Sequence, residues 1–327
     1  TGGAGFIGSH VADSLVQAGH RVVVLDDLSG GFPDNVPSGA TLVRGTICDH
    51  ELVNRLFNRH RFTHVYHLAA YAAENLSHFI KRFNYHNNLI GSVNLINESV
   101  KHGVKCFVFT SSIAVYGALK PPMREEDTPR PEDPYGIAKL AVEQDLRTTH
   151  EMFGMPYVIF RPHNVYGERQ NIGDRYRNVI GIFMNQIMRD EPMTIFGDGR
   201  QTRAFTYAGD IAPVIADAPF RPDAHGQVFN VGADTPYEVR VLAERVAAAM
   251  GVPPQIRFLE ARHEVVHAYS SHDKVRAYFD CPPETSLDDG LARMASWART
   301  VGSRQSKSFG EIEIPRNLPP SWASVSS

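Results

Sequence analysis

The chain opens on the stretch that decides its fold, Thr1 to His10, which reads TGGAGFIGSH. Gly2, Gly5 and Gly8 form a G-x-x-G-x-x-G pattern. Residues without a Cβ allow a tight turn and a close approach of the backbone to a pyrophosphate. A helix that follows such a loop points its N-terminal amides and the positive end of its dipole at the phosphates. The stretch therefore predicts a dinucleotide-binding turn that leads into a helix.

The residues that follow support this prediction over a simple structural turn with a helix N-cap. A helical pattern spans Ser9 to Ala18, and the β-branched run RVVVL covers Arg21 to Leu25, followed by Asp26 and Asp27. An acid at a strand end roughly 20 residues beyond the loop accepts the ribose hydroxyls of NAD. It also repels the additional phosphate of NADP, so we predict NAD as the cofactor.

Further along, short apolar runs alternate with longer helical patterns. Thr63 to Ala70 (THVYHLAA) and Cys106 to Ser111 (CFVFTS) read as buried parallel strands, and His78 to Lys101 reads as a helix between them. This alternation predicts an α/β fold, a Rossmann-type doubly wound parallel sheet, over residues 1–160. The glycine loop in such a sheet follows a buried central strand, so we expect a strand ahead of Thr1 that the sequence given does not contain.

After residue 160 the composition and the pattern of the sequence change. Residues 161–303 are predicted to form a smaller C-terminal substrate-binding domain, interwoven with the first, and residues 304–327, rich in Ser and Pro, a tail. Helical patterns in this part cover Asn178 to Arg189, Glu238 to Met250 and Leu287 to Thr300, and a short strand covers Val228 to Val231.

Composition excludes several classes of protein. The 327 residues are 43% hydrophobic, as a packed core requires, and the net charge of -3 gives no reason to expect a nucleic-acid surface. No apolar run reaches the roughly 20 residues of a membrane span, so no membrane association is expected. Cys48, Cys106 and Cys281 lie far apart, which favours reduced thiols and a cytoplasmic protein over a disulfide framework.

A second group of residues predicts the catalytic chemistry of the site. Pro134 to Lys139 reads PYGIAK, so that Tyr135 and Lys139 share one face if the segment is helical. A free tyrosine, with a pKa of about 10, is a poor base at neutral pH, but a neighbouring ammonium and a positive nicotinamide ring favour the phenolate. Upstream, FTSSIAVYG ends a strand in hydroxyl residues, where open α/β sheets bind ligands. Ser112 there is expected to hydrogen-bond the reacting hydroxyl.

The segment His263 to His267, HEVVH, matches the zincin motif H-E-x-x-H. A zinc protease needs these residues on a helix together with a third ligand. The two valines and the surrounding ARHEVVHAYS instead resemble a strand, so we predict no metal site. Glu74, in YAAENLSH, is either a residue that reaches the substrate or a solvated loop acid.

Together these motifs resemble the extended short-chain dehydrogenase/reductase family, in particular its nucleotide-sugar epimerases of the UDP-glucose 4-epimerase type. The resemblance covers roughly Thr1 to Thr300. Its motifs occur in the family's order: TGGAGFIGSH, the LDD strand end, HLAA, the pair Asn87 and Asn88, SSIAVYG and PYGIAK. The combination is far more specific than any single motif.

The resemblance implies a role for individual residues. Ser112, Tyr135 and Lys139 match the family's catalytic triad. The cofactor site would comprise the loop with Gly2, Gly5, Phe6, Ile7 and Gly8, then Asp26 at the ribose, Thr46 and Ile47 by the adenine, Leu68, Ala69 and Ala70 along the cofactor, Asn88 near its phosphate side, and Tyr135 and Lys139.

For the nucleotide sugar, the resemblance implies diphosphate contacts, a uracil pocket and a ribose acid. The residues are Asn164 and Asn178 at the diphosphate, Thr194 and Phe196 at the uracil, Arg203 at a phosphate and Glu264 at the uridine ribose, with Ser112 and Tyr135 at the sugar. The chain departs from the family at Thr46, usually an acid, at His163, usually an aromatic residue of another kind, and at Ala261, usually an arginine. Ala268 falls where the family carries either a bulky or a small pocket residue, and the small side chain would leave room for an N-acetyl or other larger substituent.

The residues after Ser112 discriminate between reactions. Dehydratases of the family carry T-D-E there and decarboxylases a Ser-Glu, whereas this chain has Ile113 and Ala114. The resemblance thus implies a homodimeric epimerase in which Tyr135 deprotonates the 4-hydroxyl of a UDP-sugar, hydride passes to NAD, the 4-keto sugar turns, and hydride returns to its other face. The alternatives are a sugar-nucleotide dehydratase, decarboxylase or reductase and, from another class, an inactive NAD-binding sensor or scaffold.

Overall fold

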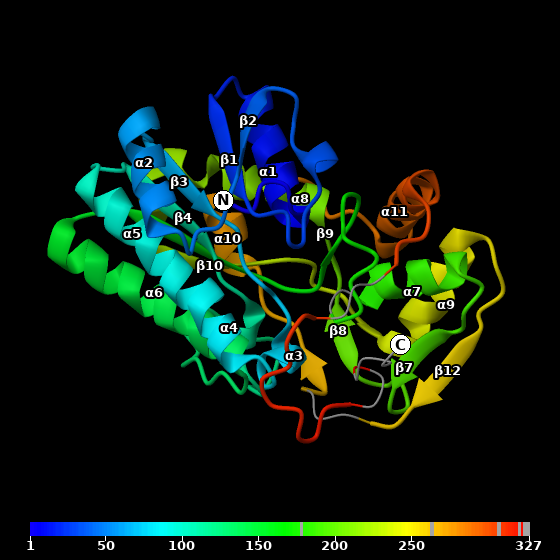
Figure 1. Ribbon diagram of the computed structural model, residues 1–327. Helices are drawn as coiled ribbons and strands as arrows, with labels where there is room; N and C mark the ends of the chain where they lie inside the picture. Colours follow the sequence, from blue (N-terminus) through cyan, green and yellow to red (C-terminus); the bar gives the residue numbers. More distant parts are fainter. Residues whose placement is uncertain (177–178, 262–264, 306–308, 320–321, 323–327) are drawn as a thin grey trace.

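The computed structural model describes residues 1–176, 179–261, 265–305, 309–319 and 322. A four-stranded parallel sheet lies at the centre of its larger body (Figure 1), with the spatial order β10-β5-β4-β3. The strands are β3 (His64–His67), β4 (Cys106–Thr110), β5 (Tyr157–Pro162) and β10 (Gln227–Val231). The predicted α/β fold with a parallel sheet is confirmed.

Helices cover both faces of this sheet, which explains the continuous apolar runs. Every residue of β4 is buried, and successive side chains point to opposite faces. Phe107 and Phe109 pack against α2, α5 and α6, whereas Val108 packs against α1 and α8. These helices are α1 (Phe6–Gln17), α2 (His50–His60), α5 (Gly91–Lys101), α6 (Pro134–Phe153) and α8 (Ala208–Asp217).

Two further strands, β1 (Val22–Asp26) and β2 (Ala40–Arg44), pair with one another in a separate parallel sheet. Among the described residues no strand joins β1 to β3, and the two flank a cavity of about 330 Å³. Thr1 connects their ends: its ammonium donates to the Tyr66 carbonyl at 2.7 Å, while the Gly2 N–H donates to the Leu25 carbonyl at 3.0 Å. These bonds fix the start of the glycine loop between the carboxyl ends of β1 and β3.

A smaller lobe lies on the right of Figure 1. Its core is formed by α7 (Val179–Met188), α9 (Val239–Met250) and α11 (Leu287–Val301), packed on β7 (Met193–Phe196), which pairs with β12 (Ile256–Leu259). The three helices predicted in this part of the chain are confirmed over their described residues. Within the described ranges, no helix combines the length and apolar character that a membrane crossing requires.

The predicted helix His78 to Lys101 is wrong at its start and interrupted. Residues 78–80 precede α4 (Lys81–Tyr85), and a π-helical turn, His86–Ile90, separates α4 from α5. Such single π turns recur at functional sites. Apart from 3-10 turns, the remaining short elements are α3 (Glu74–Ser77), α10 (Asp273–Tyr278), β6 (Val165–Tyr166), β8 (Thr202–Ala204), β9 (Thr206–Tyr207), β11 (Pro236–Glu238) and β13 (His267–Ala268).

Candidate active site

One continuous cleft of about 670 Å³ runs from the glycine loop to the smaller lobe, a volume typical of small-molecule sites. It collects most of the residues that the sequence analysis singles out. Those lining it are Gly2, Gly5, Phe6, Ile7, Gly8, Asp26, Thr46, Ile47, Leu68, Ala69, Ala70, Ser112, Tyr135, Lys139, Asn164, Thr194, Phe196 and Arg203, together with Glu74. Asn178 and Glu264 lie outside the described residues.

The glycine loop forms a cradle that side chains would fill. Gly2 has φ +73°, and a Cβ there would lie 2.6 Å from the Ala69 nitrogen. A Cβ on Gly8 would lie 2.1 Å from the Gly2 carbonyl oxygen. Phe6 and Ile7 line the cleft in the first turn of α1, where backbone N–H groups have no partner within the helix. Free donors and absent side chains at one place fit a pyrophosphate.

Asp26 lies at the end of β1 with its side chain nearly buried. Its carboxylate accepts hydrogen bonds from the Ala4 N–H at 3.0 Å and the Leu28 N–H at 2.9 Å. A carboxylate has about four acceptor sites, so it retains acceptor capacity toward the cleft that it lines. This fits a ribose diol. The cradle and this acid together fit the expected NAD.

Asn88 is the predicted cofactor residue that does not reach the cleft wall. Its amide is buried and brackets the backbone of Tyr71, accepting from the N–H at 2.8 Å and donating to the carbonyl at 3.1 Å. It also donates to Asn84 Oδ1 at 2.8 Å. Asn88 therefore supports the cleft wall at Tyr71 from behind.

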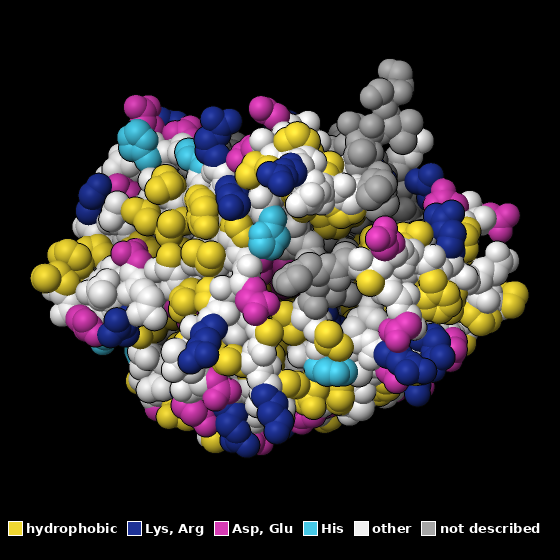
Figure 2. Space-filling model, turned by 90° about the horizontal axis from the view of Figure 1, so that it is seen from below, with side chains coloured by type: hydrophobic (Ala, Val, Ile, Leu, Met, Phe, Trp, Pro, Cys, Tyr) yellow, Lys and Arg dark blue, Asp and Glu magenta, His cyan; other side chains and the backbone are white. Residues whose placement is uncertain are grey.

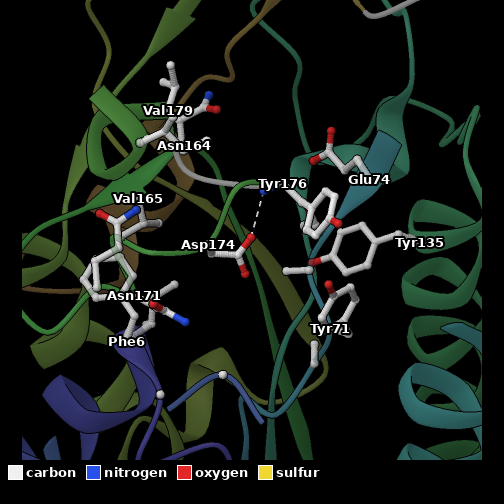
Figure 3. Close-up of a pocket in the computed structure, with 18 of the residues that line it drawn as sticks. Phe6, Tyr71, Glu74, Tyr135, Asn164, Val165, Asn171, Asp174, Tyr176 and Val179 are labelled. Atoms are coloured by element: carbon white, nitrogen blue, oxygen red, sulfur yellow. Dashed lines mark hydrogen bonds between the residues drawn. The ribbon is translucent and has the colours of Figure 1, made fainter. Parts of the chain in front are cut away.

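The start of α6 places Tyr135. Asp133 caps this helix by accepting the Gly136 N–H at 2.9 Å, and Pro134 occupies its first turn. The Tyr135 N–H donates to Ser77 Oγ at 3.2 Å, which ties the helix start to α3. Figure 3 shows the Tyr135 phenol pointing into the cavity toward the rings of Tyr71 and Tyr176. The tyrosine is thus held by its backbone and presents its hydroxyl to the cleft.

Lys139 follows one turn later on the same face of α6, and its side chain is almost fully buried. Its Nζ donates to the Thr110 carbonyl at 2.7 Å and lies 5.8 Å from the centre of the Tyr135 ring. Burial lowers the pKa of Lys139 to about 7, and the charge of Glu143 opposes that shift. Ser112, the N-cap of the 3-10 turn after β4, lies on the same wall, where its Oγ accepts the Ala114 N–H at 3.1 Å. The three predicted catalytic residues therefore line one cleft.

Behind this wall lies a buried polar network that the sequence analysis missed. Glu143 accepts from Arg161 Nε at 2.9 Å and Nη2 at 2.5 Å, and also from the Ser111 hydroxyl. Arg161 also donates to the Tyr116 hydroxyl at 2.7 Å, which donates to Asn230 at 2.8 Å. The signal was present: Glu143 follows Lys139 by four residues on α6, so Tyr135, Lys139 and Glu143 form one stripe.

At the other end of the cleft, Asn164 has φ +42° and accepts the Thr206 N–H through its carbonyl at 3.2 Å. Thr194 and Phe196 lie on β7, and Arg203 lies on β8 with its guanidinium anchored to the Val265 and Val266 carbonyls. These residues share the cleft with the glycine cradle, although they come from the smaller lobe.

Two of the positions singled out in the comparison with the family, His163 and Ala268, lie around this end. His163 is buried, with Nε2 3.0 Å from His272 Nε2, and burial lowers its pKa to about 3. Ala268 lies opposite Arg203 in the β13–β8 ladder. Within the described part of the chain, no three His, Cys, Asp or Glu side chains gather in a way that could hold a metal ion, while His263 and Glu264 of the HEVVH segment lie outside it.

The model of the NAD dependent epimerase/dehydratase family matches residues 1–232. The chain belongs to this family. The predicted extended short-chain dehydrogenase/reductase of the nucleotide-sugar epimerase type, with NAD as its cofactor, is confirmed, and the chain is an enzyme of that type.

Individual relatives span almost the whole chain. The UDP-glucose 4-epimerase of Thermotoga maritima, solved with UDP-glucose, has a TM-score of 0.87 at 33% identity and covers 92% of this chain and 97% of its own. The putative UDP-glucose 4-epimerase of Methanocaldococcus jannaschii is 31% identical over 91% of this chain and 97% of its own length. A UDP-N-acetyl-alpha-D-glucosaminuronate decarboxylase of Bacillus cytotoxicus is 27% identical over 92% of this chain and 97% of its own length. The related proteins are therefore named for more than one reaction.

Proposed function

We propose that the protein inverts C4 of a UDP-sugar through a 4-keto intermediate. The observation that carries this proposal is that Ser112, Tyr135 and Lys139 line the same cleft as the glycine cradle. The two 4-epimerases named above, one of them solved with UDP-glucose, support it.

In this mechanism the Tyr135 phenolate removes the proton of the sugar 4-hydroxyl, and the Ser112 hydroxyl shares a hydrogen bond with that oxygen. Lys139, in its charged form, stabilises the phenolate through its nearby ammonium. NAD, when bound, supplies the acceptor and later the donor of the hydride. After the ketone turns, a hydride would return to the other face of C4 while Tyr135 gives the proton back to the 4-oxygen, so that the overall reaction is redox-neutral.

We assign the reaction to epimerisation because the residues next to Ser112 carry no acidic or basic side chain. Ile113 and Ala114 begin the 3-10 turn there, and neither side chain can act as an acid or base that eliminates water or assists loss of CO₂. A dehydratase or decarboxylase would have to use another group, such as Glu74 on α3. An inactive NAD-binding sensor would have no need of the catalytic set.

We propose that the nucleotide part of the substrate binds in the same cleft. Asn164 and Arg203, with Asn178, would bind the diphosphate, since a guanidinium fork suits phosphate oxygens. Thr194 and Phe196 would hold the uracil, and Glu264 the uridine ribose. Residues 161–303 would then form the substrate-binding domain and residues 1–160 the NAD-binding domain, with β10 crossing back into the first sheet.

We also propose a homodimer through α5 and α6. Ile137, Met152 and Phe153 on α6 are 44%, 75% and 64% exposed, and Ile90 before α5 is 47% exposed. Figure 2 shows hydrophobic side chains gathered on the side of the molecule where Figure 1 places α6. An exposed apolar area of this kind marks an interaction surface. Sedimentation should give a dimer, and Phe153→Glu should give monomers.

The deciding experiment is incubation with a panel of UDP-sugars (glucose, N-acetylglucosamine, glucuronate and a pentose), followed by separation of C4 epimers and measurement of product mass. We expect an epimer of unchanged mass from at least one sugar. Tyr135→Phe should abolish turnover and retain NAD binding. A product that has lost water or CO₂ would support a dehydratase or decarboxylase. NAD binding without any product would support the sensor.

A further inference from the structure

The C-terminal strap, defined here as residues 309–319 and 322, lies beyond the family match at residues 1–232. In Figure 1 it is the red segment that passes α3, between the larger body and the smaller lobe. The sequence analysis predicted a tail here. The described residues instead make specific contacts with the segment that precedes and includes α4.

Polar contacts anchor the middle of the strap. The Glu313 carboxylate accepts the N–H groups of Arg82 and Phe83 at the start of α4, both at 2.8 Å. A carboxylate at a helix N-terminus is favoured by the free amides and the helix dipole. The N–H groups of Glu313 and Ile314 donate to the Phe79 carbonyl at 2.9 and 3.1 Å. Four hydrogen bonds therefore fix the register of the strap on residues 79–83.

Aromatic contacts bind its two ends. The Phe309 ring packs against Tyr71 and Phe83, with ring centres 5.3 and 4.9 Å apart, and its N–H donates to the Tyr176 hydroxyl at 3.2 Å. Trp322 is 4% exposed and packs edge-to-face on Tyr176 at 5.4 Å and on Phe79 at 6.3 Å. Both ends of the strap therefore contact tyrosines of the cleft wall.

These tyrosines lie at the catalytic end of the cleft. Figure 3 shows Tyr71 and Tyr176 facing Tyr135 around the cavity, with Glu74 beside them. Trp322 itself also lines the cleft. It packs in one apolar cluster with Ala73 and Leu76, next to the Ser77 hydroxyl that receives the Tyr135 N–H. The strap thus contacts two tyrosines of the cleft wall that face Tyr135, and Trp322 packs in the apolar cluster beside α3.

We propose that Trp322 is a positioning residue for the sugar: through Tyr176 it keeps the wall of the cleft closed around the sugar ring. This inference rests on the proposed epimerase function. The 4-keto sugar must stay bound while it turns between the two hydride transfers, and a loose wall would let it leave after the first. The faces of aromatic rings offer the apolar surface on which the C–H groups of a sugar pack.

Trp322→Ala in the full chain tests this directly. Loss of the two edge-to-face contacts of Trp322 should raise KM for the UDP-sugar roughly tenfold, with a smaller change in kcat. The variant should also accumulate the absorbance of reduced nicotinamide during turnover, because the ketone escapes before the hydride returns. Trp322→Phe should restore both. Trp297→Phe on α11, a partly buried residue packed against the core of the smaller lobe, is the matched control and should change neither.

A binding measurement separates this inference from the proposed function. The chain has two tryptophans, so Trp297→Phe leaves Trp322 as the only one. UDP-sugar should change its fluorescence and UDP alone should not, whether or not any sugar is epimerised. If UDP and UDP-sugar have the same effect, or if Trp322→Ala lowers the melting temperature without changing KM or releasing the ketone, the positioning role is wrong. Should Trp322→Ala fail to fold, Glu313→Gln, which weakens the anchor on α4, must show the same KM increase.

Discussion

The buried ion pair between Glu143 and Arg161 leads to the sharpest prediction about the free energy of unfolding. Glu143 and Arg161 are each 4% exposed at the side chain and share two hydrogen bonds. Glu143→Met keeps the volume but leaves the Arg161 guanidinium buried without its counter-charge. Breaking a buried pair from one side costs about 3–5 kcal/mol. Since a domain is stable by about 5–15 kcal/mol, the variant should lose a large part of its free energy of unfolding.

Urea denaturation of the NAD-free protein measures this loss. The double variant Glu143→Met, Arg161→Met removes both charges and should recover most of the stability, because paired burial of ions adds little over apolar packing. Asp288→Asn is the matched control: its pair with Arg245 is exposed, with side chains 68% and 38% accessible, and should cost about 1 kcal/mol or less. A Glu143→Met variant no less stable than this control would refute the reasoning.

Three further predictions concern the cofactor site and Lys139. Gly8→Ala places a Cβ 2.1 Å from the Gly2 carbonyl, so NAD affinity measured by calorimetry should fall at least about tenfold, and unchanged affinity would exclude the cradle as the phosphate site. Asp26→Ser removes the charge that repels a 2′-phosphate, so the ratio of NADP to NAD affinity should rise, and a constant ratio would contradict the ribose role. Burial lowers the pKa of Lys139 to about 7 in the folded protein, well below its ordinary value of 10.5, so unfolding releases the ammonium from a site that disfavours it. The unfolded chain therefore binds more protons between these pH values, and this group should make the NAD-free protein more stable as pH rises above 7, by up to about 1.4 kcal/mol per pH unit. Lys139→Met should remove that slope, and an identical slope in both proteins would show that another group titrates.

The sequence predicted the parts of the site that one local pattern encodes. The cradle required glycines because backbone groups approach within contact distance, and Gly2 and Gly8 show this directly. Tyr135 and Lys139 were predictable because a helix brings residues four apart onto one face. The strand at Cys106 to Thr110 was predictable because burial on both faces leaves no polar position.

What the sequence did not reveal depends on residues brought together by the fold. Glu143 and Arg161 are 18 residues apart, and only the packing of α6 on β5 makes one the partner of the other. Asn88 belongs to a family motif, yet its amide is occupied by Tyr71, which no spacing rule predicts. Trp322 contacts residues more than 140 positions earlier in the chain, so a composition typical of a tail concealed its place in the cleft.

The buried network of Glu143 and Arg161 lies close to Lys139, so its charges bear on the protonation of the groups around Tyr135. Lys139 and Arg161 contribute two positive charges to a buried region in which Glu143 contributes one negative charge. Buried charge without compensation is costly, so one proton should be lost from this set near neutral pH. It can leave the Lys139 ammonium, whose pKa is lowered to about 7, and that loss makes the set neutral. In the proposed mechanism, a positive nicotinamide ring bound near Tyr135 would favour the phenolate. In the proposed mechanism Arg161 would act without touching the substrate: it compensates Glu143, so that the charge of Lys139 would be left to stabilise the phenolate.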